Sequence, residues 1–474
     1  SGCMDECASN YNPDAVINSD CIYDRHVFYV SNEGSDVDGD GCDQNPFFTI
    51  QLGIDTALNG DTVMVLPGTY LENINFNGKN ISVIGLDREL TIINGNQSGI
   101  VVTFENGENS YAKLIGFTIM QGLENYGGGI KLSNSNPTIE NVTITQNQSS
   151  RGAGLHIEYS NPILKNVIIS ENYGSSKAGG IWSYSSDLNL ENVIIKDNIA
   201  GSTYGGGIYL HTSNLVYNGG EIVNNESNQQ GGGMHIWNEA STPQVQVNVT
   251  LNNILIAGNS SQNGGGIKVG FACNLILNNV TMMGNHSDYN GGAIYNGEGD
   301  LNIINSIIWN NTSDSFAPGI FHFLSHPQPS EYQGTTTISY TDIQYGEEGI
   351  FASGQSWVED LEIVGINWLE GNIDEDPLFC NSSNGDFTVG SNSPVLGAGQ
   401  NGVNMGAFGI GCVLGCMDTL ACNHNPDATI NDGSCEYFNP EIMCDCDETF
   451  LDVNGDCCST LLMDDCWVCN GNNE

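Results

Sequence analysis

Basic residues are scarce in this chain. Its 474 residues include 10 Lys and Arg against 56 Asp and Glu, which gives a formal net charge of −46 at pH 7. A surface of this sign repels nucleic acid and anionic membranes, and it attracts cations such as calcium. We therefore expect no nucleic-acid partner. A hydrophobic content of 39% argues against general disorder, so we expect the chain to fold.

Long hydrophobic runs are also missing, and cysteine is nearly absent from the middle of the chain. No apolar run approaches the roughly 18 residues of a membrane-spanning helix, so no transmembrane segment is predicted. Of the 16 cysteines, 14 lie before residue 43 or after residue 411. Such terminal clusters are typical of disulfide-rich modules in an oxidising compartment. We expect an extracellular protein, secreted or associated with the cell surface, and, since it opens on Ser1 without a signal sequence, a mature or excised segment.

What the chain has in abundance is a repeat. A glycine cluster followed by an aliphatic residue occurs seven times, from GGGIK at Gly127 to GGAIY at Tyr295, with spacings of 25 to 33 residues. A period of this size is typical of a solenoid, in which each repeat buries its apolar face by stacking on its neighbours. A second strand in each repeat ends on asparagine. Stacked coils would place these amides about 4.8 Å apart, as a hydrogen-bonded ladder. Its members are Asn147, Asn172, Asn198, Asn225, Asn259, Asn285 and Asn311.

The segment before the repeats supports a specific architecture. Residues 29–36 read YVSNEGSD, and residues 45–70 read NPFFTIQLGIDTALNGDTVMVLPGTY. This passage resembles the N-terminal cap and first coils of secreted proteins of the pectin-lyase-like superfamily. Residues 371–409 resemble the closing coils of the same proteins. The resemblance implies an all-β fold, a right-handed parallel β-helix, with an acidic loop and a capping helix in residues 25–60 and the coils in residues 61–411.

The two ends of the chain carry copies of one small module. Residues 2–23 read GCMDECASNYNPDAVINSDCIY, and residues 415–437 read GCMDTLACNHNPDATINDGSCEY. The pattern resembles a Cys-rich repeat of secreted multidomain proteins from marine Bacteroidetes. We predict disulfide-rich modules at 1–24 and 412–443, followed by a Cys-rich linker or tail at 444–474. Cys7 aligns with Leu420 and Cys422 with Ser9, so the pairing in one copy does not follow from the other.

Acidic turns suggest calcium as a structural cofactor. Residues 36–41 fit the D-x-D-x-D-G opening of a calcium loop, in which alternate carboxylates converge on a hard cation. Position 12 of an EF-hand would be Phe47, which is not a ligand, so a calcium loop of another kind and a plain acidic turn both stay open. Similar residues in the modules have the same two interpretations. The candidate ligands are Asp36, Asp38, Asp40, Asp14, Asn18, Asp20, Asp427, Asn431 and Asp432.

The outward positions of the repeats carry the most specific hint of function. Strand alternation predicts two adjacent outward rows on one face, and six neighbouring positions over three coils are aromatic or imidazole. Exposed aromatic rows suit the stacking of sugar rings or a protein interface. Alternatively, these bulky side chains pack along the sheet or beneath a loop. The predicted ligand-binding face is Trp182, Tyr184, Tyr209, His211, His235 and Trp237.

Catalysis is the other function that the resemblance implies. Many pectin-lyase-like proteins cleave acidic polysaccharides, which requires a cationic base near acidic calcium ligands. The only mixed cluster here is Lys131, Arg151, His156 and Glu158, and no facing carboxylate pair of a hydrolase stands out. The negative surface also opposes uronate substrates. We therefore predict a structural or adhesive segment of a larger cell-surface protein, appendage or filament, which binds a glycan or protein and neighbouring modules or subunits. The alternative is a secreted polysaccharide lyase or hydrolase.

Overall fold

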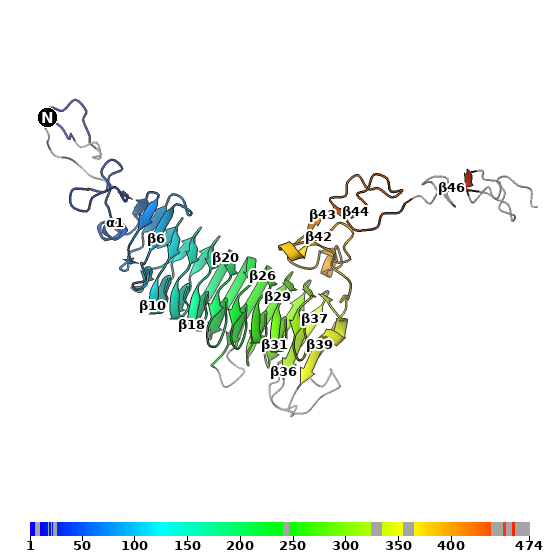
Figure 1. The fold of residues 1–474 in the computed structure, drawn as a ribbon. Helices are drawn as coiled ribbons and strands as arrows, with labels where there is room; N and C mark the ends of the chain where they lie inside the picture. Colours follow the sequence, from blue (N-terminus) through cyan, green and yellow to red (C-terminus); the bar gives the residue numbers. More distant parts are fainter. Residues whose placement is uncertain are drawn as a thin grey trace, which may run out of the picture. The chain divides into compact units, whose positions relative to one another are not determined.

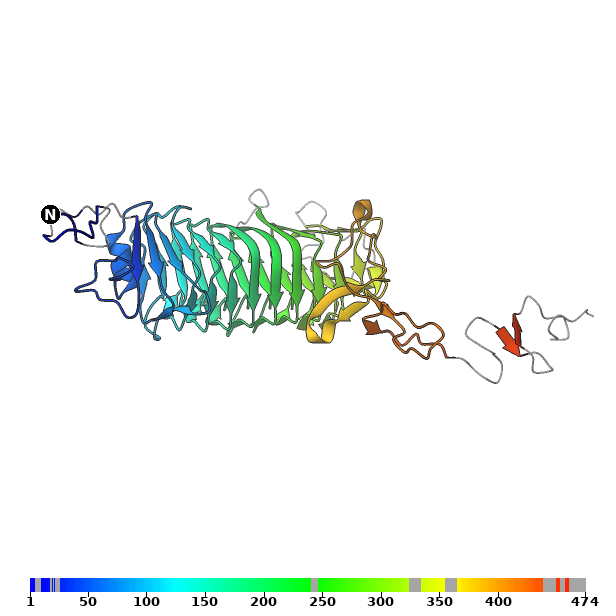
Figure 2. The ribbon, with the colours of Figure 1, turned by 90° about the horizontal axis from the view of Figure 1, so that it is seen from above.

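The chain coils into a parallel β-helix, as Figures 1 and 2 show. The computed structural model describes residues 1–4, 10–17, 19, 21, 26–239, 246–323, 334–353, 365–437, 449–451 and 457–459. The larger of its two units comprises Ser1–Asp374 with Gly399–Ala407, and the smaller comprises Glu375–Ala398 with Phe408–Glu474. All the strand pairs of the β-helix are parallel and join successive coils, which confirms the predicted fold class. No helix of the described part is long and apolar enough to cross a membrane.

Three sheets, numbered here in the order in which each coil visits them, form the larger unit. Sheet 1 has 21 strands, sheet 2 has eight and sheet 3 has eleven. Sheet 1 contains β1 (Val27–Val30), β2 (Thr62–Val65), β3 (Gly68–Tyr70), β5 (Ser82–Gly85), β6 (Thr91–Asn94), β8 (Lys113–Ile115), β9 (Thr118–Met120), β12 (Thr138–Glu140), β13 (Thr143–Thr145), β16 (Ile163–Lys165), β17 (Ile168–Ser170), β20 (Asp187–Lys196), β23 (Asn214–Val223), β26 (Val247–Ala257), β29 (Cys273–Asn278), β30 (Thr281–Met283), β33 (Asp300–Ile304), β34 (Ile307–Trp309), β37 (Thr336–Ser339), β38 (Asp342–Ile343) and β40 (Ile366–Trp368).

Sheets 2 and 3 carry the shorter strands that matter for the candidate site. Sheet 2 contains β10 (Leu123–Tyr126), β14 (Gln148–Arg151), β18 (Tyr173–Lys177), β21 (Ile199–Ala200), β24 (Glu226–Ser227), β27 (Ser260–Asn263), β31 (His286–Asn290) and β35 (Thr312–Ser313). Sheet 3 contains β4 (Ile74–Asn75), β7 (Val102–Phe104), β11 (Ile130–Ser133), β15 (Leu155–Glu158), β19 (Ile181–Tyr184), β22 (Ile208–His211), β25 (Met234–Trp237), β28 (Ile267–Val269), β32 (Ile294–Gly297), β36 (Ile320–Phe323) and β39 (Ile350–Ser353).

The core of the coil stack is mainly aliphatic and includes a row of asparagines. The aliphatic residue after each glycine cluster is fully buried, as Ile181 and Ile208 illustrate. The asparagine ladder is confirmed: the amide of Asn147 donates to Oδ1 of Asn172 at 3.0 Å, and the same bond joins each following pair up to Asn311 at 2.9 or 3.0 Å. Leaving one such buried group without a partner costs about 1 to 3 kcal/mol. The ladder therefore fixes the turn between sheets 1 and 2.

A short helix, α1 (Ile50–Thr56), follows β1 and packs against the first strands of the β-helix, as predicted. The hydroxyl of Thr49 accepts a hydrogen bond from the backbone N–H of Leu52, and the carboxylate of Glu72 accepts from the first two backbone N–H groups of the helix. These contacts satisfy donors that a helix start leaves open. Ile50 and Ile54 are buried, so the helix covers apolar residues of the first coils.

The terminal modules share one pairing of their cysteines. Disulfides join Cys3 to Cys21 and Cys416 to Cys435. In the smaller unit a disulfide joins Cys380 of β41 (Phe379–Asn381) to Cys412 of β43 (Ile410–Cys412), and β42 (Asp386–Gly390) pairs with both strands. Short pairs also form between β44 (Leu414–Gly415) and β45 (Ile430–Asn431), and between β46 (Thr449–Leu451) and β47 (Cys457–Ser459). The smaller unit begins at residue 375, and the domain bounds expected from the sequence stay a prediction.

Candidate functional site

The outward residues of sheet 3 stack in two rows, because alternate residues of a strand face the same way. Within each row, the residues of successive coils lie in register. The first row contains Lys131, His156, Trp182, Tyr209, His235, Lys268 and Tyr295. The second row contains Ser133, Glu158, Tyr184, His211 and Trp237. The predicted juxtaposition of six aromatic and imidazole side chains is therefore present.

The exposure predicted for the first row is wrong. Trp182, Tyr209 and His235 are only 3%, 2% and 1% exposed. The physical reason is that side chains at the end of sheet 2, and in the turn that follows it, pack against this row. The ring centroid of Tyr126 lies 5.4 Å from that of His156, and the centroid of Tyr204 lies 5.8 Å from that of Tyr209. The first row is therefore covered and is not part of the exposed face.

The glycine clusters make this close packing possible. Gly152 precedes β15 with φ of +61°, a left-handed conformation that glycine adopts without steric cost. A Cβ atom at Gly152 would lie 2.8 Å from the Cβ atom of Trp182, and one at Gly205 would lie 2.8 Å from that of Tyr209. The repeated glycine thus lets the chain turn from sheet 2 to sheet 3 directly beside the large rings of the first row.

Basic side chains lie among the rings of the first row. The guanidinium of Arg151 lies 5.5 Å from the ring centroid of Tyr126 and 6.0 Å from that of Trp182. The ammonium of Lys177 lies 5.2 Å from the centroid of Tyr209. All three distances suit a cation–π contact. Burial, with the nearby charge of Arg151, lowers the pKa of Lys177 below its ordinary value.

Burial lowers the pKa of two imidazoles in this row. The rings of His156 and Trp182 stack, and burial lowers the pKa of His156 although Glu158 opposes that shift. Burial lowers the pKa of His235 still further, and the charges of Lys268 and Lys177 act in the same direction. Neither ring nitrogen of His235 has a hydrogen-bond partner among the described residues. These histidines are packing groups and are not accessible to a polymer.

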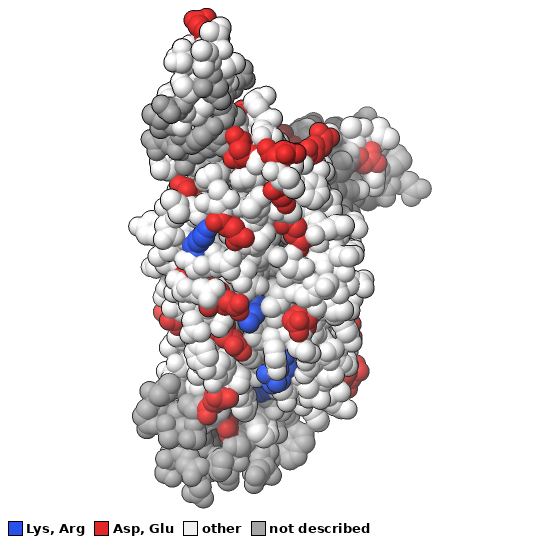
Figure 3. Space-filling model, turned by 90° about the vertical axis from the view of Figure 1, so that its left-hand side faces the viewer, with Lys and Arg blue, Asp and Glu red and all other residues white. Residues whose placement is uncertain are grey.

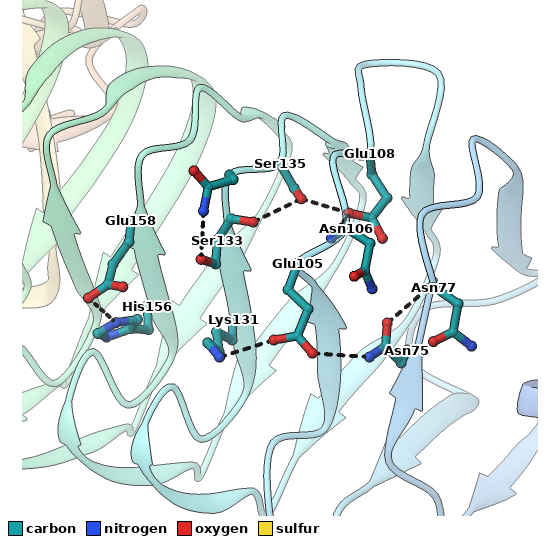
Figure 4. Close-up of polar contacts among 11 residues, drawn as sticks. Asn75, Asn77, Glu105, Asn106, Glu108, Lys131, Ser133, Ser135, His156 and Glu158 are labelled. Atoms are coloured by element: carbon teal, nitrogen blue, oxygen red, sulfur yellow. Dashed lines mark hydrogen bonds and ion pairs between the residues drawn. The ribbon is translucent and has the colours of Figure 1, made fainter.

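The four candidate catalytic residues do come together on adjacent coils, as Figure 4 shows for three of them. Nζ of Lys131 lies 3.1 Å from a carboxylate oxygen of Glu105, and Nε2 of His156 lies 3.1 Å from one of Glu158. The backbone carbonyl of Arg151 lies 3.4 Å from Nδ1 of His156. Each charged group of the cluster is therefore already paired or stacked, and the cluster contains no unengaged base.

The second row is the solvent-facing part of the predicted face. Trp237 is 42% exposed, and the rings of Tyr184 and His211 are half-buried with their centroids 4.9 Å apart. Nε2 of His211 lies 2.8 Å from a carboxylate oxygen of Glu239. Tyr159 extends the row at the turn, with its ring centroid 5.4 Å from that of Tyr184. The sequence prediction missed Tyr159 and Glu239, since neither lies at a repeated strand position.

A serine ladder, also missed, holds the backbone of the second row in place. The backbone N–H of Ser160 donates to the hydroxyl of Ser186, and that hydroxyl donates to the carbonyl of Tyr184 at 2.7 Å. Ser135 begins the ladder, and its hydroxyl donates to the buried carboxylate of Glu108 (Figure 4). The signal was available in the sequence, because these serines recur with the period of the glycine clusters. The ladder comprises Ser135, Ser160, Ser186 and Ser213.

The calcium candidates act in turns and caps where the structure describes them. Oδ1 of Asp36 accepts hydrogen bonds from the backbone N–H groups of Phe48 and Thr49, just before α1. The carboxylates of Asp36, Asp38 and Asp40 do not converge as a set of ligands among the described residues. In the second module the side chains of Asn431 and Asp432 accept from backbone groups two residues further on. Asp14 and Asp427 also lie in described turns, whereas Asn18 and Asp20 lie outside the described residues. Calcium binding stays a prediction.

Comparison with known proteins supports the fold only. The family model described as right handed beta helix region matches residues 74–254, in agreement with the predicted handedness. No curated protein matches the chain. A crystal structure of pectate lyase Pel9A is similar at 14% identity over 81% of this chain and 96% of that one, with a TM-score of 0.44. A rhamnogalacturonan lyase is similar at 11% identity over 75% and 90%, with a TM-score of 0.26.

Proposed function

We propose that this protein is an extracellular structural or adhesive segment whose β-helix presents the second row of sheet 3 to a glycan. One observation carries the proposal. Tyr184, His211 and Trp237 stand in register on three successive coils, at the strand spacing of about 4.8 Å. Each coil thereby offers one ring, with an apolar face and a polar edge, to a ligand that runs along the coil axis.

The chemistry around the row favours a neutral glycan. The carboxylates of Glu158 and Glu239 flank the rings and can accept hydrogen bonds from sugar hydroxyls. Figure 3 shows acidic side chains spread over the face that it draws, with only a few basic ones among them. With a net charge of −46, the surface repels uronate polymers. We therefore place polymers of uncharged sugars ahead of acidic polysaccharides.

Rigidity supports an adhesive role. The buried first row lies directly beside the second, and the serine ladder holds the backbone at the ends of β11, β15, β19 and β22. A site of fixed geometry loses little conformational entropy on binding, which favours affinity. The disulfide-bonded modules at both ends are compatible with an extracellular chain joined to neighbouring modules or subunits of a larger assembly.

Catalysis is the second candidate, because Lys131, Arg151, His156 and Glu158 do cluster on adjacent coils. Two observations argue against a catalytic role. The ammonium of Lys131 is paired with Glu105, and the side chain of His156 is 1% exposed, so neither is a free base at the surface. The family-model match concerns the fold and names no activity.

Binding to a panel of immobilised neutral and acidic polysaccharides tests the proposal. We expect Trp237→Ala and Tyr184→Ala to weaken binding to a neutral glycan at least tenfold, while Trp309→Ala, a matched change on sheet 1, leaves it unchanged. Equal binding by all four proteins would refute the proposal. The same polysaccharides, incubated with and without calcium, should show no new reducing or unsaturated ends. Cleavage that Lys131→Ala abolishes would establish the enzymatic alternative.

A further inference from the structure

A second group of functional side chains lies on sheet 2, away from the second row. His286 and Asp288 belong to β31, and Asp314 follows β35 on the next coil. One ligand atom of each lies within 4.8 Å of the others, the only such group of three among the described residues. Ser287 is fully buried, so strand alternation turns His286 and Asp288 toward solvent. Register then brings Asp314 beside Asp288, since the backbone N–H of Asp314 donates to the carbonyl of Ser287.

The imidazole of His286 is oriented as a metal ligand would be. Its Nδ1 lies 2.9 Å from the hydroxyl oxygen of Thr312 on the next coil. Its Nε2 faces Oδ1 of Asp288 at 3.7 Å, which is longer than a hydrogen bond. A histidine that binds a metal through one ring nitrogen usually hydrogen-bonds through the other, which fixes its orientation. Thr312 supplies that second contact.

The charges around the group also favour a bound cation. Asp288 and Asp314 bring two carboxylates together on adjacent coils, which is unfavourable without a counter-charge. No ion pair of the described residues joins either carboxylate to a lysine or arginine. A cavity of about 390 Å³ adjoins Asp288 and is lined by polar side chains that include Glu226, Ser260 and Gln262. Water can therefore reach the group and complete a coordination shell.

We propose that His286, Asp288 and Asp314 bind a divalent first-row transition-metal ion, such as Zn²⁺, with water in the remaining position. One imidazole and two carboxylates are a donor set that suits such an ion. Calcium instead takes six to eight oxygen ligands and has little use for an imidazole. This metal site shares no residue with the second row. Its test is therefore independent of the test of glycan binding.

Isothermal titration calorimetry with Zn²⁺ alone tests the site. The sample is the full chain, treated with a chelator and with its disulfides intact. We expect His286→Gln and Asp288→Asn to remove one equivalent of bound Zn²⁺ or weaken it at least tenfold. Asp288 is exposed, so its substitution should leave the circular dichroism spectrum unchanged. Glu124→Gln is the matched control, an exposed carboxylate on β10 of the same sheet, and should bind like the wild type. The proposal is overturned if the wild type binds no Zn²⁺, if both variants keep the equivalent, or if the control loses it.

Two further measurements separate this site from other kinds of cation binding. Thr312→Val removes the contact to Nδ1 of His286 and should weaken Zn²⁺ binding about 10-fold to 100-fold, the usual cost of losing such a partner. Titration with Ca²⁺ should give much weaker binding. Strong Ca²⁺ binding that Asp288→Asn abolishes and His286→Gln leaves intact would show an all-oxygen site and contradict the proposal.

Discussion

The imidazole of His156 lies flat on the indole of Trp182, with ring centroids 4.4 Å apart and an angle of 12° between the planes. Both side chains point outward from sheet 3, yet both are almost fully buried. Sheet 2 covers them, with Arg151 of β14 contributing to that cover. Some outward side chains of sheet 3 are therefore as well buried as those of the core, and they should contribute to stability in the same way.

Removing the indole of Trp182 should destabilise the protein. Large-to-small changes of buried aromatic residues typically cost about 3 to 5 kcal/mol, because a cavity remains. We expect Trp182→Ala to lower Tm markedly in a thermal scan followed by circular dichroism. Trp237→Ala is the matched control, and its loss should be much smaller because Trp237 is 42% exposed. Equal losses for the two variants would contradict the packing described for the first row.

A buried lysine should make stability depend on pH. Burial lowers the pKa of Lys268 from 10.5 to about 7, although Cys273 and Glu298 oppose the shift. Between those two values the unfolded chain holds a proton that the native chain lacks, so stability rises with pH and falls as pH drops toward 7. The slope is at most about 1.4 kcal/mol per pH unit.

Comparing Tm at pH 7, 8 and 9 for the wild type and Lys268→Met checks this dependence. The wild type should gain stability relative to the variant as pH rises. Methionine preserves much of the packing against Tyr295, whose ring centroid lies 3.8 Å from Nζ, but it cannot titrate. A constant difference in Tm across this range would mean that Lys268 does not have a lowered pKa.

The turn glycine beside Trp182 should resist substitution for a steric reason. Gly152 and Gly284 have nearly the same φ, +61° and +62°, so alanine meets the same conformational cost at both. A Cβ atom at Gly152 would lie 2.3 Å from the carbonyl oxygen of Leu155, whereas at Gly284 nothing lies within 4 Å. We expect Gly152→Ala to lower Tm well beyond Gly284→Ala. Similar losses would show that the backbone conformation, and not the steric contact of a Cβ atom, requires the glycine.

Much of the fold follows from local patterns that the sequence displays. Strand alternation places Ile181 in the core, and the repeat period predicts the ladder through Asn198, since each depends only on residues at equivalent positions of neighbouring coils. The helix after Pro46 follows from apolar residues at helical spacing. In each case the contact that stabilises the residue is repeated from coil to coil, so the pattern itself contains the information.

The candidate sites depend on contacts that do not repeat. Register correctly predicts that Tyr184 neighbours His211, but the sequence does not show that Arg151 and Tyr204 cover the first row. Likewise, among the described coils only one has a histidine and a carboxylate of sheet 2 close to a carboxylate of the next coil. No periodic signal therefore marks His286.

The sequence by itself thus determined the β-helix, its N-terminal cap, the inward rows and the order of the side chains along sheet 3. Only the tertiary structure decided which of those outward side chains reach solvent. The physical reason is the turn between sheets 2 and 3. At that turn, Gly152 and its equivalents bring the outward side chains of two sheets into contact, and the angle between two sheets is a property of the stacked coils, which no strand pattern specifies.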